Sequence, residues 1–248
     1  MPRSRDLDWD GCLNVRDLGG HRTTDGGETR FGEIVRADSI RQLSDTGWRA
    51  AVDYGVRTVV DLRMDAELEA DPPAELPVDV LHLPFFYEDE EAFAEVEAAS
   101  ASAADTASAT REVYLVFLER FRANVAAAFA AVARAPDGTV VVHCMGGKDR
   151  TGLLVALLLR VAGVDDAQVA ADYSVSEERL RPRHEAWLAE AGTDAERERV
   201  RRIAATPAES MLGVLTELER RYGSVEDYLR AGGLGDEELE LVRKRLRG

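Results

Sequence analysis

The two most apolar runs of this chain lie close together in the sequence, and they constrain its fold more than any other feature. Thr139–Val142 (TVVV) is typical of a buried strand, and Leu153–Val161 (LLVALLLRV) predicts a helix that is apolar nearly all round. Residues 143–152 must then form a short connection between a buried strand and a buried helix. Such a unit is typical of an α/β core.

The rest of the chain alternates strand-like and helix-like segments before it becomes helical throughout. β-branched or alternating runs predict strands, and amphipathic runs that end at Gly or begin with capping residues predict helices. The predicted strands are Phe31–Ala37, Val56–Leu62 and Val78–Phe85, and the predicted helices are Ser44–Tyr54, residues 111–134 and most of residues 172–248. We therefore predict one α/β domain over residues 1–248, with a central, mostly parallel sheet flanked by helices and a helical C-terminal part packed on the core.

Residues 88–110 differ in composition from the rest of the chain. They begin with Glu88-Asp89-Glu90-Glu91 and continue with many Ala and Ser residues. This composition favours a solvated acidic face or a mobile loop. The alternative is a lid or a substrate-selecting insert, because long irregular segments in compact domains are often functional.

Charge and composition exclude several classes of protein. The net charge of −16 argues against a nucleic-acid partner, which would require a basic face, so any anion site must be built locally. No apolar run is long enough for a transmembrane segment, and no signal core is present at the N-terminus, which predicts a cytoplasmic protein. Two cysteines do not make a disulfide framework, and the four histidines have no zinc-like spacing. We therefore expect no metal and no cofactor.

The connection that follows the TVVV run has the composition of an anion site. It reads His143-Cys144-Met145-Gly146-Gly147-Lys148-Asp149-Arg150-Thr151-Gly152. A tight Gly-containing loop directs its backbone N–H groups inward, and the helix that follows adds its own unsatisfied N–H groups. The predicted phosphate-binding residues are those of the loop: Met145, Gly146, Gly147, Lys148, Asp149 and Arg150.

Cys144 is the predicted nucleophile of this site. The electropositive end of a helix favours the thiolate form of a cysteine, and the planar guanidinium of Arg150 can hold two phosphate oxygens at once. Thr151 is placed to give its hydroxyl to the departing sulfur. The competing interpretation is an inert, buried cysteine at the end of a strand. For His143, a buried histidine that orients the loop is favoured over a direct catalytic role.

The same run resembles the phosphate-binding loop of the cysteine-based phosphatases, which share a Cys-x5-Arg pattern. Its Gly-Lys-Asp-Arg-Thr-Gly form resembles the bacterial atypical tyrosine/lipid phosphatases, including a secreted mycobacterial enzyme. Weaker matches to that group are scattered over the chain: Asn14–Gly20, Arg36-Ala37-Asp38, Asp61-Leu62-Arg63, Leu83-Pro84-Phe85, Asp172-Tyr173, Tyr222-Gly223-Ser224 and Tyr228-Leu229. The resemblance implies a metal-independent phosphatase that acts on phosphotyrosine, and also on phosphoserine, phosphothreonine or phosphoinositides.

Such an enzyme needs a general acid for the leaving oxygen. We rank Asp149 first, followed by Asp89, Glu88 and Asp61. Each has a structural alternative: a helix cap for Asp149, plain surface charges for Glu88 and Asp89, and an anchor for Arg63 or Arg16 in the case of Asp61. Arg16, Asp17 and Arg63 are expected either to form a supporting ion-pair shell near the loop or to stabilise the fold.

The predicted reaction is hydrolysis of a phosphate monoester through a cysteinyl-phosphate intermediate. The expected partners are a phosphorylated protein or phospholipid as substrate and inorganic phosphate as product. Three alternatives stay open: another thiolate enzyme such as an arsenate reductase or a sulfurtransferase, a catalytically inactive phosphate-binding module, and an enzyme acting on small phosphorylated metabolites.

Overall fold

The fold is built on a five-stranded, mostly parallel sheet, as the sequence predicts. The computed structural model describes residues 3–71 and 78–248. The strand order is β1-β2-β5-β3-β4, and only β1 runs antiparallel to its neighbour. The strands are β1 (Arg16–Asp17), β2 (Ile34–Ala37), β3 (Val56–Asp61), β4 (Asp79–His82) and β5 (Thr139–His143). The two-residue β1 was not predicted, because residues 1–30 contain turn signals and no strand-like run.

β5 is the central strand, and its two faces point into two different cores. Val140 and Val142 contribute to the larger hydrophobic cluster, whereas Val141 contributes to a smaller one on the opposite face. This alternation follows from the two-residue period of a strand. Because both faces are covered by apolar side chains, all five residues of β5 are buried. The C-terminal end of β5 is therefore held rigidly at the middle of the sheet.

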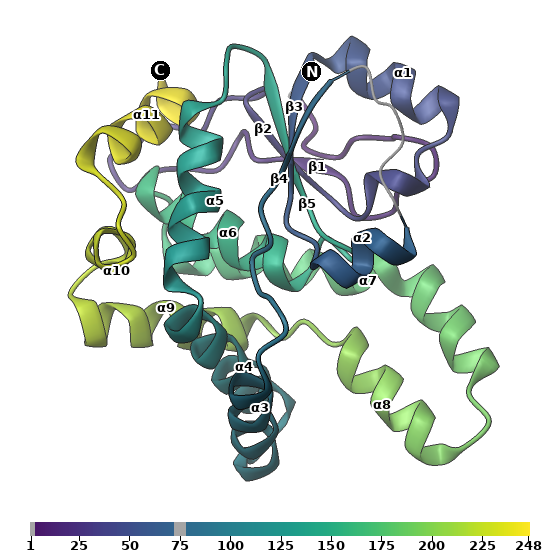
Figure 1. The fold of residues 1–248 in the computed structure, drawn as a ribbon. Coiled ribbons are helices and arrows are strands. Elements are labelled where there is room, and N and C mark those ends of the chain that lie inside the picture. Colours follow the sequence, from purple (N-terminus) through teal and green to yellow (C-terminus); the bar gives the residue numbers. More distant parts are fainter. Residues whose placement is uncertain (1–2, 72–77) are drawn as a thin grey trace.

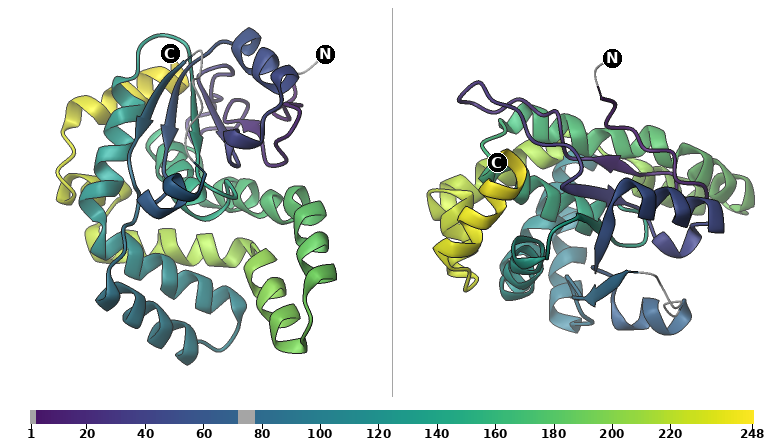
Figure 2. Two further views of the ribbon diagram at one scale, coloured as in Figure 1. Left: turned by 45° about the vertical axis from the view of Figure 1, so that its right-hand side comes forward. Right: turned by 90° about the horizontal axis from the view of Figure 1, so that it is seen from above.

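Helices cover the two faces unequally (Figures 1 and 2). α1 (Asp45–Tyr54) packs on the smaller core, with Ala51 against strand residues such as Val59. The opposite face is covered by α5 (Arg122–Arg134) and α6 (Asp149–Val161). Outside them lie α7 (Asp166–Glu190), α9 (Ala208–Tyr222), α10 (Val225–Ala231) and α11 (Asp236–Arg247), which join the same core.

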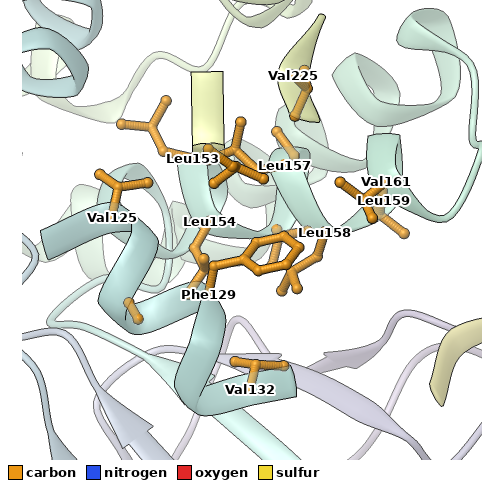
Figure 3. Packing of buried hydrophobic residues seen from close by; sticks show 14 of the residues in the cluster. Val125, Phe129, Val132, Leu153, Leu154, Leu157, Leu158, Leu159, Val161 and Val225 are labelled. Atoms are coloured by element: carbon orange, nitrogen blue, oxygen red, sulfur yellow. The ribbon is translucent and has the colours of Figure 1, made fainter. Parts of the chain in front are cut away.

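The apolar helix predicted at Leu153–Val161 is the centre of this larger core. α6 begins four residues earlier than the apolar run, at Asp149, and ten of its residues are buried. Figure 3 shows Leu154 and Leu158 of α6 beside Phe129 of α5, with Val225 of α10 on the other side of the helix. A helix surrounded by apolar neighbours fixes the direction of the loop that precedes it, because repacking such a core costs several kcal/mol.

Most of residues 88–110 are helical, so the interpretation as a mobile loop is wrong, whereas the solvated acidic face and the lid or substrate-selecting insert stay predictions. They form α3 (Glu90–Ser102) and the first part of α4 (Thr106–Arg120). Asp89 and Asp105 are the N-caps, and each accepts a hydrogen bond from the backbone N–H of the third residue of its helix. Ala and Glu are strong helix formers, which explains why a segment of low apolar periodicity folds as a helix.

The helix predicted over residues 111–134 is interrupted. α4 ends at Arg120 and α5 begins at Arg122, with Phe121 between them. The ring of Phe121 packs against Phe86 and Phe117, at centroid distances of 5.5 and 6.1 Å. This aromatic cluster ties the α3–α4 pair to the segment that follows β4.

α2 (Asp65–Ala70) and α8 (Asp194–Ala204) complete the described chain. Neither helix contains a buried residue. In Figure 1, α8 extends from the end of α7 on the same side of the molecule as α3 and α4. Among the residues that the structure describes, no helix is both long and apolar enough to cross a membrane.

Candidate active site

The loop that carries Cys144 connects the central strand to the buried helix. β5 ends at His143 and α6 begins at Asp149. Cys144 is 2 % exposed. Gly147 has φ +61°, and a Cβ atom at this position would lie 2.2 Å from the carbonyl oxygen of Ala37. The loop therefore requires glycine here, both for backbone conformation and for its close approach to β2.

Three consecutive carbonyl groups of the loop are fixed by donors outside it. The carbonyl of Met145 accepts from the Ser39 N–H at 3.0 Å. The side-chain amide of Asn14 donates to the carbonyls of Gly146 and Gly147, at 3.0 and 3.1 Å. A trans peptide unit is planar, with its N–H and C=O on opposite sides. The N–H groups of Gly146, Gly147 and Lys148 therefore point away from the donors that bind these carbonyls. None of these three N–H groups has a hydrogen-bond partner in residues 3–71 and 78–248, which makes them available to an anion.

A buried ion cluster of Arg16, Arg36 and Asp172 holds in place the side chains that donate to the loop carbonyls. Arg36 Nη2 donates to the Gly147 carbonyl at 2.7 Å, and its Nη1 donates to Asp172 at 2.7 Å. Arg16 bonds to Asp172 through Nε at 3.0 Å and to Asn14 Oδ1 through Nη1 at 2.6 Å. Burial alone would raise the pKa of Asp172, but the charges of Arg16 and Arg36 hold that pKa well below its ordinary range. The carboxylate is therefore ionised and keeps both arginines oriented.

Arg150, in the first turn of α6, is held by Glu67 of α2. Its Nη2 donates to Glu67 Oε1 at 2.8 Å, its Nη1 donates to Oε2, and Nη1 also lies 3.5 Å from the Leu62 carbonyl oxygen. Burial lowers the pKa of Arg150. The hydrogen bonds to Glu67 and the charge of that carboxylate oppose burial, and the pKa of Arg150 is raised above its ordinary value. The contacts with Glu67 and Leu62 fix the guanidinium of Arg150 in the first turn of α6.

Asp149 lies beside the loop and is bound by two neighbours. Its Oδ1 accepts a hydrogen bond from the Tyr114 hydroxyl, which also contacts the Tyr173 hydroxyl at 2.9 Å. Lys148 Nζ is 3.4 Å from the same carboxylate and also donates to the Ile203 carbonyl at the end of α8. The Asp149 side chain is 47 % exposed, so its carboxyl group remains accessible to a substrate.

The other candidate acids have different contacts. Asp89 Oδ1 accepts from the Ala92 N–H as the cap of α3, and Glu88 is exposed on the surface. Asp61 is buried and forms an ion pair with Arg63 at 2.8 Å, as one of the sequence-based alternatives predicted. Of the four candidates, the structure places Asp149 within the loop region and engages Asp61 and Asp89 in structural contacts.

The predicted shell of Arg16, Asp17 and Arg63 does not form as one unit. Arg16 binds Asp172, whereas Arg63 binds Asp61 and Asp71. Asp17 accepts hydrogen bonds from the Tyr54 hydroxyl and from the N–H groups of Gly19 and Gly32. Only Arg16 reaches the loop, through Asn14. Arg16 and Asp17 are adjacent on β1, where successive side chains point to opposite faces, and Arg63 follows β3.

His143 and Thr151 are fully buried behind the loop. His143 Nδ1 lies 3.2 Å from the Cys144 carbonyl oxygen, and its Nε2 lies 3.6 Å from Asp61 Oδ2. Burial lowers the pKa of His143 below its ordinary value, although Asp61 opposes this effect. The Thr151 hydroxyl has no hydrogen-bond partner among the described residues, so it is free to bond to the sulfur.

A cavity of about 950 Å³ opens beside Asp149. Its walls come from α3, α4 and α8, and its lining includes Lys148, Tyr114, Phe93 and Ile203. Within the described part of the chain, no group of three or more His, Cys, Asp or Glu side chains is arranged to hold a metal ion.

Sequence reasoning missed five residues of this region as site residues: Asn14, Arg36, Glu67, Tyr114 and Asp172. Asn14, Arg36 and Asp172 belong to short segments that match the phosphatase group, so the signal was present without a role attached. Glu67 and Tyr114 had no such signal, because each meets the loop only through the tertiary fold.

Comparisons with known proteins agree on one family. The pattern of the "Tyrosine phosphatase family" matches residues 7–248. A "Tyrosine-protein phosphatase" of Nostoc commune is 30 % identical over 229 residues, which cover 86 % of this chain and 74 % of that protein. The "Triple specificity protein phosphatase PtpB" of Mycobacterium tuberculosis is 29 % identical over 96 % of this chain and 98 % of its own length. A "Putative tyrosine-protein phosphatase" of Cupriavidus necator is 27 % identical over 98 % of this chain and 87 % of its length.

Proposed function

Because this chain belongs to the tyrosine phosphatase family, we propose that it hydrolyses phosphate monoesters, phosphotyrosine first among them, through a cysteinyl-phosphate intermediate on Cys144. The observation that carries the proposal is that the loop N–H groups of Gly146, Gly147 and Lys148 have no hydrogen-bond partner among the described residues, while donors from outside the loop fix the carbonyls of the same peptide units. Preorganised donors of this kind stabilise the charge of a transferring phosphoryl group.

In the first step the Cys144 thiolate attacks phosphorus in line with the leaving oxygen. The loop N–H groups and Arg150 bind the equatorial oxygens, which carry charge in the ground state and in the transition state. Asp149 protonates the leaving phenolate. In the second step a water molecule attacks the thiophosphate, phosphate is released, and Thr151 hydrogen-bonds to the departing sulfur.

Asp149 is favoured as the general acid by its position. It is the first residue of the helix that follows the loop and lines the cavity with a half-exposed side chain, whereas Asp89 caps α3, Asp61 pairs with Arg63 and Glu88 is exposed on the surface. The cavity meets the loop at Lys148 and Asp149 and is not lined by Cys144 or Arg150, so we assign it to the part of a substrate beyond the phosphate, such as the residues that flank a phosphorylated side chain. We extend the proposal to phosphoserine, phosphothreonine and phosphoinositides as further substrates to be compared.

The first test is hydrolysis of p-nitrophenyl phosphate in the presence of a chelator, comparing wild type with Cys144→Ser. We expect chelator-resistant turnover that is lost in the variant, because a serine hydroxyl at the same site is a far weaker nucleophile at neutral pH. An inactive, folded and reduced wild type would reject the proposal in favour of an inactive phosphate-binding member of the family.

The second test concerns the acid. Asp149→Asn should slow hydrolysis of a phosphotyrosine peptide by about 10²–10⁴-fold and slow p-nitrophenyl phosphate much less, because nitrophenolate leaves without a proton. Equal losses on the two substrates would remove Asp149 from this role. A comparison of phosphotyrosine, phosphoserine and phosphoinositide substrates then ranks the substrate classes.

A further inference from the structure

Glu67 is the only described carboxylate that pairs with Arg150, and the way it pairs is specific. Each terminal nitrogen of the guanidinium donates to a different oxygen of the carboxylate. Nη2 donates to Oε1 at 2.8 Å, and Nη1 donates to Oε2. A guanidinium has five N–H groups in a fixed plane. The hydrogen bonds of the described residues therefore leave Arg150 Nε–H and the second Nη2–H free. These two groups form the other edge of the fork.

Glu67 is itself fixed in position. Its Oε2 accepts the N–H of Met64, the N-cap residue of α2, at 2.7 Å, so Glu67 caps the N-terminus of its own helix. The Arg150 and Glu67 side chains are 13 % and 19 % exposed. Burial would raise the pKa of Glu67, but Arg150 lowers it overall, so the carboxylate is ionised at neutral pH. The pair joins the start of α6 to the segment that follows β3.

The pairing is costly unless it has a positional benefit. A carboxylate next to a phosphate dianion weakens phosphate binding by simple repulsion. A free guanidinium on a long side chain, however, must lose rotamer freedom to present one edge to two oxygens. Holding the opposite edge in advance removes that loss at the moment of reaction.

We propose that Glu67 is a positioning residue that holds Arg150 by one edge of its guanidinium, so that the Nε–Nη2 edge faces the equatorial oxygens of the transferring phosphoryl group. This inference rests on the proposed function of Arg150. Its benefit is realised in the transition state, where the geometry of the oxygens is most demanding, and its electrostatic cost is present in the ground state. Loss of Glu67 therefore lowers kcat more than it raises KM.

Two substitutions separate positioning from helix capping. Glu67→Gln keeps an oxygen for the Met64 N–H but loses the ion pair, whereas Glu67→Ala loses both contacts. Glu69→Gln is the matched control, because Glu69 is an exposed residue of the same helix and undergoes the same change of charge.

The measurements are kcat and KM for p-nitrophenyl phosphate, calorimetric affinity for orthovanadate and the thermal midpoint. For Glu67→Gln we expect kcat to fall about 10- to 100-fold, vanadate to bind more weakly and the thermal midpoint to stay near that of wild type. In an Arg150→Lys background, Glu67→Gln should cause no further loss, because the fork that it orients is absent.

The failures of the two proposals are distinguishable. A wild type that binds vanadate without turnover rejects the hydrolase activity, and the vanadate affinities then decide the role of Glu67. Glu67→Gln that behaves like Glu69→Gln in kcat and vanadate affinity would overturn the inference, as would an equal loss with and without Arg150. A change in the thermal midpoint alone, seen only in Glu67→Ala, would reduce Glu67 to a helix cap.

Discussion

The side-chain amide of Asn14 lies 3.1 Å from the carbonyl oxygen of Gly147, although 133 positions separate the two residues in the chain. The same amide also binds the neighbouring carbonyl of Gly146. An N-terminal segment thus determines which way the peptide units of the catalytic loop face. Asn14 is completely buried, and its loss removes the donor of the Gly146 carbonyl and one of the two donors of the Gly147 carbonyl, which keeps only Arg36 Nη2.

The first prediction concerns this amide. Asn14→Asp keeps the shape of the side chain but places oxygen against the loop carbonyls. We expect it to destabilise the fold by about 1–3 kcal/mol and to weaken orthovanadate binding, because the loop amides are no longer held inward. Urea unfolding and calorimetry measure the two effects. Unchanged vanadate affinity in a folded variant would show that the loop keeps its shape without Asn14.

A second prediction isolates the close approach of the loop to β2. Gly147→Ala places a Cβ atom 2.2 Å from the Ala37 carbonyl oxygen, in a backbone conformation that side chains rarely adopt. Gly233→Ala is the control, since Gly233 also has positive φ (+98°) but open space around it. The control should cost about 1–2 kcal/mol of strain.

Gly147→Ala should cost more than Gly233→Ala in the free energy of unfolding, and it alone should abolish turnover. Both variants are compared by urea unfolding and by p-nitrophenyl phosphate hydrolysis. An active Gly147→Ala enzyme would mean that the loop can move away from β2 without losing its anion site.

The third prediction concerns the carboxylate that orients Arg16 and Arg36. Asp172→Asn leaves two buried guanidinium groups without a counter-ion, and breaking a buried pair in this way costs about 3–5 kcal/mol. We expect the corresponding loss in urea unfolding. Asp227→Asn, which removes an exposed partner of Arg230, should have little effect. Similar losses in both variants would argue against the buried cluster as an anchor of the loop.

The strand–loop–helix unit that carries Cys144 was predictable from sequence because its determinants are local. One short stretch contains the strand, two glycines, Cys144, Arg150 and the apolar helix. Each of these features predicts a local structure or a chemical role by itself. The sheet followed from similar local runs. α3 and the start of α4, before residue 111, were missed because they contain few periodic apolar residues, although the caps Asp89 and Asp105 were visible signals.

The contacts that complete the site are not local. Glu67 lies 83 positions from Arg150, and Tyr114 lies 35 positions from Asp149. No pattern within α2 distinguishes Glu67 from the neighbouring Glu69, because both are acidic residues of a short surface helix. Only the packing of α2 against the start of α6 separates them. Pairing of this kind depends on tertiary structure and is not encoded in any single segment.

The fourth prediction concerns the dependence of stability on pH. Burial lowers the pKa of His143, and it also lowers that of His21, to about 4. In the unfolded chain both titrate near the ordinary value of about 6.5. As the pH falls below that value, the unfolded state takes up protons that the folded state does not, so stability decreases.

For wild type we therefore expect the free energy of unfolding to fall between pH 6.5 and pH 5, at up to about 1.4 kcal/mol per pH unit for each histidine. His143→Asn should reduce this slope by the contribution of one proton, up to about 1.4 kcal/mol per pH unit. This holds whatever the effect of the substitution on the free energy of unfolding at pH 7.5. Urea unfolding at several pH values measures both slopes. Equal slopes for wild type and His143→Asn would mean that His143 takes up a proton in the folded state, as an imidazolium paired with Asp61, whose carboxylate lies 3.6 Å from Nε2.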